Sequence, residues 1–220
     1  MVRRGWLVRD AMPGAHNVMR EESEARSRGV CYCDLDGVFA PYPECWLEFI
    51  EVRTGRAFGS LDEAKQGISY ADYVRLKNEY RSSEFKYSLT PRAGSPEFTR
   101  FLIQEGWFVG IVTTRPAGHR QLLIRTIRWL ERNGIVFDDI LFCDNKVEVV
   151  ARYPELVFGV EDEASEANAV ANLGYRIFLL SNPGDTRGGL HHNVTVVRSF
   201  EDIMEVLKRG PGAHENLHRQ

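Results

Sequence analysis

Two aspartates, Asp34 and Asp36, stand one residue apart in the stretch RGVCYCDLDGVFAPYPECW, residues 28–46. A run of small and apolar residues precedes them, so both carboxylates lie at the tip of a predicted buried strand. Carboxylates this close repel each other, and partial burial strengthens the repulsion. We therefore expect a metal ion to compensate their charge, with a phosphate group as its partner.

Polar side chains also follow the next three predicted strands. In open α/β sheets, ligands bind at the carboxyl ends of the strands, so these side chains should gather near the two aspartates. The residues concerned are Thr113, Thr114, Arg115, Lys146, Glu161 and Asp162.

This set of residues suits a magnesium ion and a phosphate ester. Mg²⁺ prefers hard oxygen ligands and commonly keeps a substrate phosphate. The carboxylates of Asp34 and Asp162 and the backbone carbonyl of Asp36 can supply such oxygens. Thr113 can donate a hydrogen bond to a phosphate oxygen, and Lys146 can offset negative charge on protein and substrate.

Four segments resemble, in order, the four motifs of the haloacid dehalogenase superfamily of phosphotransferases: DLDGV, IVTTRP, NKVEVV and GVEDEAS. Each follows a predicted strand, and the resemblance covers roughly residues 28–207. It implies a Rossmann-like core and an aspartyl-phosphate intermediate. It also implies that Asp34 is the nucleophile, that Asp36 is the general acid and base, and that Thr113 and Lys146 bind the phosphoryl group.

The fourth motif departs from the pattern of many such phosphatases. They carry paired aspartates, whereas this sequence has Glu161 and Asp162. The resemblance implies that Asp162 ligates the metal directly and that Glu161 reaches it directly or through water. An aspartate at position 36 favours a phosphatase over the ATPases of the superfamily, which have threonine there, and leaves a phosphomutase open.

Apolar runs alternating with helical patterns predict an α/β, doubly wound parallel sheet. Six strands are expected, the last at an edge: residues 29–35, 107–114, 139–144, 156–162, 175–181 and 193–199. Helices are expected between them over residues 95–106, 118–134, 146–154, 164–174 and 199–210. The expected core domain spans 28–40 and 93–208, with an N-terminal extension over 1–27 and a flexible tail over 209–220.

Residues 41–92 break this rhythm because they contain no strand candidate. Two helices, over 43–55 and 69–85, joined through 56–68, predict a small helical cap inserted after the first strand. Its position resembles the layout of the 5′(3′)-deoxyribonucleotidases. Such a cap can close over a small substrate and exclude water from the reacting phosphate.

Several side chains of the cap region and its surroundings are candidates for binding the substrate. Phe39 and Trp46 could stack on a base or sugar, although Trp46 also suits a core of the cap itself. Thr114 and Arg115 would contact the substrate from the second motif. Further aromatic and basic candidates are Tyr42, Tyr87, Arg75, Lys77 and Arg81.

The composition limits the remaining functional classes. The chain has 220 residues and a formal net charge of −3, which gives no case for a broad nucleic-acid or membrane surface. It lacks an apolar run of eighteen residues, so we expect no membrane span. The four cysteines are expected to be reduced thiols of a cytoplasmic protein.

The sequence thus predicts a magnesium-dependent phosphomonoester hydrolase acting on a small phosphorylated substrate, with a nucleoside monophosphate as the best single candidate. Three alternatives stay open: a sugar-phosphate phosphatase, a phosphatase of nucleic-acid 3′ ends, and a non-catalytic binding protein on the same fold. Nucleic acid and membranes are not the expected partners, and a homodimer stays open.

Overall fold

The computed structural model describes residues 28–116, 118, 120–181 and 189–209. The predicted extension over 1–27 and nearly all of the predicted tail over 209–220 lie outside these residues. Among the described helices, none is long and apolar enough to cross a membrane. All four cysteines are free thiols, as predicted.

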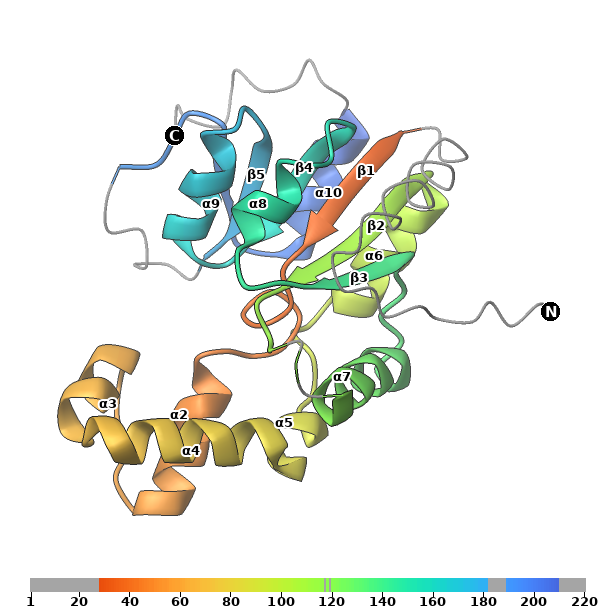
Figure 1. Ribbon diagram of the computed structural model, residues 1–220. Helices are drawn as coiled ribbons and strands as arrows, with labels where there is room; N and C mark the ends of the chain where they lie inside the picture. The colour runs from red at the N-terminus through yellow and green to blue at the C-terminus, as the bar shows by residue number, and fades with distance from the viewer. Residues whose placement is uncertain (1–27, 117, 119, 182–188, 210–220) are drawn as a thin grey trace.

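A six-stranded parallel sheet forms the centre of the molecule, in the order β3-β2-β1-β4-β5-β6 (Figure 1). The strands are β1 (Gly29–Cys33), β2 (Trp107–Thr113), β3 (Asp139–Phe142), β4 (Leu156–Glu161), β5 (Arg176–Leu180) and β6 (Val194–Val197). This arrangement confirms the predicted α/β, doubly wound parallel sheet, including the sixth strand at an edge. Because β1 pairs with both β2 and β4, the ends of these three strands are neighbours.

Helices pack on both faces of the sheet and produce two apolar layers. One layer contains side chains of α6 (Ser95–Gln104), α7 (Arg120–Arg132) and α10 (Phe200–Arg209). The other contains side chains of α8 (Lys146–Val150) and α9 (Ala164–Ala171). Strand β1 alternates between them, with Cys31 and Cys33 in the first layer and Val30 and Tyr32 in the second. Burial on both faces explains why the strands have continuous apolar runs.

Four helices lie beyond the end of the sheet towards which the strand arrows point (Figure 1). These cap helices are α2 (Glu44–Thr54), α3 (Leu61–Gly67), α4 (Tyr70–Ser82) and α5 (Glu84–Ser88). They enclose a separate apolar cluster that includes Trp46, Phe49, Leu76 and Tyr80. The cap therefore has a small core of its own and stands over the carboxyl ends of the strands.

Two details of the cap differ from the prediction. The expected connection over residues 56–68 contains helix α3, where Ser60 accepts a hydrogen bond from Glu63 N and Glu63 accepts one from Gly59 N. The expected single helix over 69–85 is interrupted at Ser83, which is extended. There the hydroxyl of Ser83 donates to the Tyr80 carbonyl, a local bond that competes with helix continuation.

Candidate active site

The loop after β1 fixes Asp34 and Asp36 against the neighbouring strand. Asp34 N donates to the carbonyl of Val160 on β4 at 2.9 Å, so the aspartate stays aligned with the sheet. Gly37 adopts a φ of +97°, a region that L-residues rarely enter. A Cβ at Gly37 would lie 1.8 Å from Oδ2 of Asp162, so the loop packs directly on that carboxylate. This contact ties the first motif to the fourth.

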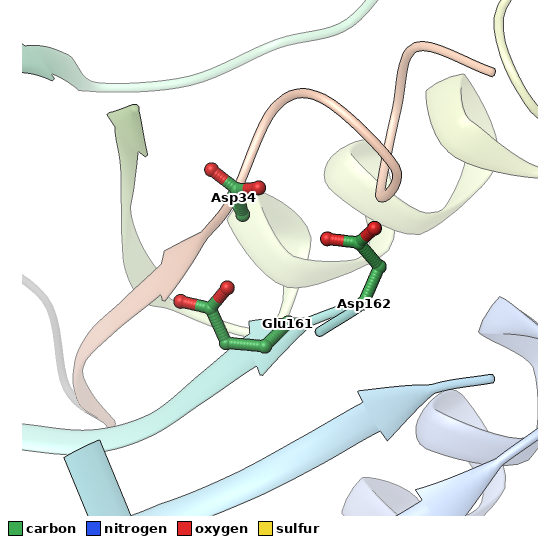
Figure 2. Close-up of side chains that lie close together, drawn as sticks. All are labelled: Asp34, Glu161 and Asp162. Atoms are coloured by element: carbon green, nitrogen blue, oxygen red, sulfur yellow. The ribbon is translucent and has the colours of Figure 1, made fainter. Parts of the chain in front are cut away.

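Three carboxylates meet where β1 and β4 end, those of Asp34, Glu161 and Asp162 (Figure 2). Each offers an oxygen that lies within 4.8 Å of the others. Lys146 Nζ lies 3.2 Å from Oδ1 of Asp34 and donates to Oε2 of Glu161 at 2.7 Å. The other oxygen of Glu161 accepts a hydrogen bond from the Tyr32 hydroxyl at 2.8 Å. Both oxygens of Glu161 therefore have donors within the protein.

Burial dominates the electrostatics of this cluster. It raises the pKa of Asp34, an effect that the charge of Lys146 opposes. Burial and the neighbouring Asp34 raise the pKa of Asp162 to about 8. A divalent cation would stabilise the ionised forms of these carboxylates. The three carboxylates fit such an ion because, among the described residues, Lys146 is the cation that pairs with this cluster. The three carboxylates can hold a metal ion. Glu161 already accepts hydrogen bonds from Tyr32 and Lys146, which leaves the carboxylate of Asp162 the more available of the two as a metal ligand.

The carboxylate of Asp36 is held by two cations. Arg115 binds it in a bidentate manner, with Nε 2.7 Å from Oδ2 and Nη2 2.6 Å from Oδ1. Lys86, from cap helix α5, lies 3.4 Å from Oδ1. Burial acts to raise the pKa of Asp36, but the charges of Arg115 and Lys86 outweigh it and hold that pKa well below its usual range. Asp36 thus joins the sheet to the cap through an ion pair.

A cavity of about 270 Å³ opens between these strand ends and the cap. The topology brings these predicted residues together in the cavity lining: Asp34, Asp36, Thr113, Thr114, Arg115, Lys146, Glu161 and Asp162. Thr113 is almost fully buried, and its hydroxyl oxygen accepts a hydrogen bond from Arg115 N at 3.3 Å.

Two predicted substrate ligands need correction, and a third is already paired within the protein. Phe39 is 0% exposed and stacks on Phe200 in the main core, and Trp46 is 0% exposed in the core of the cap. Neither side chain can stack on a substrate, because packing within the protein covers both rings. Arg115 does line the cavity, but all three of its guanidinium nitrogens already have partners, in Asp36 and Thr126.

Sequence reasoning missed two side chains of this site. Tyr32 lies in an apolar strand, where only its hydroxyl hints at a buried polar partner. Lys86 follows a polar helical segment, and no sequence signal distinguishes it from the other four lysines of the chain. It is 7% exposed nonetheless, and burial lowers its pKa to about 8.

Comparisons with known proteins place this arrangement in a structural class. No protein-family model and no curated protein matches the chain. A HAD (haloacid dehalogenase) family hydrolase from Deinococcus radiodurans, solved with bound phosphate and sodium, matches with a TM-score of 0.56 at 16% identity. That match covers 84% of this chain and 96% of the other. The chain has the haloacid dehalogenase fold.

Two further structures with this fold support the assignment. YfnB from Bacillus subtilis, bound to magnesium, is 14% identical with a TM-score of 0.57, and the match covers 83% of this chain and 100% of that one. The D,D-heptose 1,7-bisphosphate phosphatase from Burkholderia thailandensis is 17% identical with a TM-score of 0.52, over 82% and 98% of the two chains. The haloacid dehalogenase fold carries the motif residues of this chain to one end of its sheet.

Proposed function

We propose that the protein is a magnesium-dependent phosphomonoester hydrolase that works through a phosphoryl group on Asp34. The observation that carries the proposal is the position of Asp34 at the end of β1, within 3.2 Å of Lys146 and beside the carboxylates of Glu161 and Asp162. A carboxylate nucleophile divides phosphate-ester hydrolysis into two easier displacements.

In the first displacement, an oxygen of Asp34 attacks phosphorus and the ester P–O bond breaks. The leaving oxygen takes a proton from the carboxyl group of Asp36, which yields the free alcohol and an acyl phosphate on Asp34. In the second, Asp36 accepts a proton from water as that water attacks phosphorus. The bond from phosphorus to Asp34 then breaks, which releases inorganic phosphate and restores the Asp34 carboxylate and the protonated carboxyl group of Asp36.

The side chains around these aspartates support the two steps. Lys146 would hold the attacking carboxylate and the phosphoryl oxygens, and Thr113 would donate a hydrogen bond to one of those oxygens. Asp34, Asp162 and the Asp36 carbonyl would hold Mg²⁺, which supplies positive charge against the reacting phosphate. Arg115 and Lys86 favour the ionised form of Asp36, which the second displacement requires. The first displacement requires the protonated form, so we expect substrate binding to weaken the contacts of Asp36 with Arg115 and Lys86.

The position of the cap over the cavity supports a small substrate. A nucleoside monophosphate stays a prediction from the cap layout. It receives no support from Phe39 and Trp46, since both are buried. Of the aromatic candidates, Tyr42 lines the cavity.

Phosphate release tests the proposal. We expect wild-type protein to hydrolyse p-nitrophenyl phosphate or members of a panel of nucleotides and sugar phosphates with added Mg²⁺, and EDTA to abolish the reaction. Asp34→Asn should lose the activity, whereas Asp62→Asn, a matched change at an exposed position of α3, should retain it. Equal activity of wild type and Asp34→Asn would contradict the proposal.

A further inference from the structure

The charged side chains of the cavity are divided between its two walls. Every carboxylate in the lining comes from the sheet side: Asp34, Asp36, Glu161, Asp162, Glu163 and Glu166. The charged residues that the cap contributes are all cations, namely Lys77, Arg81 and Lys86. A molecule in this cavity therefore meets the carboxylates on the sheet side, together with Arg115 and Lys146, whereas every charged group on the cap side is basic.

Two of the three cap cations are not neutralised by carboxylates. Lys86 pairs with Asp36, but within the described residues neither Lys77 nor Arg81 has an ion pair. Lys77 Nζ instead donates to the Tyr42 hydroxyl at 3.0 Å and lies over the rings of Tyr42 and Trp46, 4.5 and 4.7 Å from their centroids. An ammonium group held in an aromatic setting without an ion-pair partner can accept an anionic ligand at little rearrangement cost.

Partial burial of Lys77 disfavours its charged form. It lowers the pKa of this side chain to about 8, and the charge of Asp36 only partly opposes the effect. Contacts with Tyr42 and Trp46 already fix the position of Lys77 Nζ, so an incoming anion would meet an oriented hydrogen-bond donor.

The location of these cations relates them to the leaving group. The transferred phosphoryl group belongs at Asp34, Lys146 and Thr113, and the leaving oxygen belongs at Asp36. Lys86 touches Asp36 from the cap, and Lys77 and Arg81 lie on the adjacent helix α4. The part of the substrate that extends beyond the leaving oxygen would therefore meet Lys77 and Arg81.

The cavity also continues in this direction. A second hollow, of about 470 Å³, lies between α4 and α7 and shares Arg81, Pro116 and Leu122 with the first. Arg81 stands at the junction of the two, which leaves room for a leaving group larger than a methyl or ethyl unit. Arg125 in the second hollow is engaged by Glu84 and the Ser82 carbonyl, so Arg81 is the available cation there.

We propose that the preferred substrate is a phosphate ester whose leaving group carries a second anionic group, a phosphate or a carboxylate, bound by Lys77 and Arg81. This inference rests on the proposed phosphatase function and narrows it to phosphate esters with an anionic leaving group. It predicts that a neutral leaving group, including an uncharged nucleoside, is handled less efficiently than an anionic one of similar size.

Matched substrate pairs test the inference and distinguish the two anions. For a carboxylate, 2-phosphoglycolate is compared with isobutyl phosphate, which has a neutral group with the same number of non-hydrogen atoms. For a phosphate, fructose 1,6-bisphosphate is compared with the two fructose monophosphates. We expect kcat/KM for the more anionic member to be higher by about tenfold or more in at least one pair, the ratio given by one charge-assisted hydrogen bond.

Variants then assign the preference to the cap. Lys77→Met and Arg81→Met should each reduce the ratio within the preferred pair by about tenfold, and Arg81→Met serves if the partly buried Lys77 is needed for folding. Arg75→Met is the matched control, because Arg75 is exposed on the same helix and is absent from the cavity lining. A wild-type ratio near one in both pairs, or a preference that survives both cap variants, would overturn the inference.

A binding measurement separates this inference from the proposed chemistry. Calorimetric titration of Asp34→Asn with 2-phosphoglycolate, isobutyl phosphate, fructose 1,6-bisphosphate and the fructose monophosphates needs no turnover. Tighter binding of a more anionic member, lost with Lys77→Met or Arg81→Met in the same background, would support the inference even if the wild type hydrolysed nothing. Equal binding within both pairs, or no binding of any probe, would refute it.

Discussion

Replacing Arg115 with methionine tests how strongly the protein holds Asp36. The change removes two hydrogen bonds to the carboxylate, at 2.6 and 2.7 Å, and a third to Thr126, while keeping much of the apolar stem. Loss of one partner from a buried ion pair costs about 3–5 kcal/mol, and the Asp36 side chain is 26% exposed. We therefore expect the free energy of unfolding at pH 7 to fall by about 2–3 kcal/mol, below that range because solvent screens part of the pair.

The pH dependence of this loss follows from the depressed pKa of Asp36. Because its pKa in the folded protein lies below the value of about 3.9 for an unfolded aspartate, the stabilisation is complete above pH 5 and declines as the pH falls. Arg115→Met lacks most of this stabilisation at any pH. The difference in unfolding free energy between wild type and variant should therefore narrow by about 1 kcal/mol between pH 6 and pH 3.

Urea unfolding followed by tryptophan fluorescence measures both quantities. Arg125→Met provides the control, since Arg125 forms an exposed ion pair with Glu84 and should change stability by less than about 1 kcal/mol. Equal stability of wild type and Arg115→Met, or a difference that does not change between pH 6 and pH 3, would refute the reasoning about Asp36.

Three further substitutions have defined outcomes. Gly37→Ala should abolish phosphatase activity and lower the free energy of unfolding by at least about 1–2 kcal/mol, because the new Cβ meets Asp162 at a positive φ; retained activity would contradict this packing. Tyr32→Phe should cost about 1.5–3 kcal/mol in urea unfolding, since buried Glu161 loses a donor, and an unchanged midpoint would argue against the bond. Phe39→Ala should cost about 3–5 kcal/mol, as expected for a core ring; a stable variant with only a raised KM would restore Phe39 as a substrate ligand.

The strands and the residues at their ends could be predicted from the sequence because both depend on local patterns. Continuous apolar runs indicate strands buried on both faces. In a parallel sheet the carboxyl ends of the strands lie together, so the residues that follow them, among them Asp34, Lys146 and Asp162, are expected to meet there. Helix α3 was also accessible in principle, since Ser60 and Glu63 have the spacing of a capping box.

The remaining features depend on tertiary packing. Phe39 and Trp46 are aromatic residues near the predicted site, and only the packing of the loop and of α2 shows that they turn into apolar cores. Lys86 has no distinguishing neighbours in sequence, and its contact with Asp36 requires the cap to fold over the sheet. The fork of Arg115 suits a carboxylate of the protein as well as a phosphate of a substrate, so its residue type could not decide between them.

The most direct test of the proposed mechanism is detection of the phosphoryl group on Asp34. Wild-type protein turning over its best phosphate ester with Mg²⁺ would be quenched in acid, digested and examined by peptide mass spectrometry. We predict one added phosphoryl group on the peptide containing Asp34, and none on the corresponding peptide of Asp34→Asn. Turnover with no phosphoryl group on Asp34, or with the group on another residue, would contradict the account.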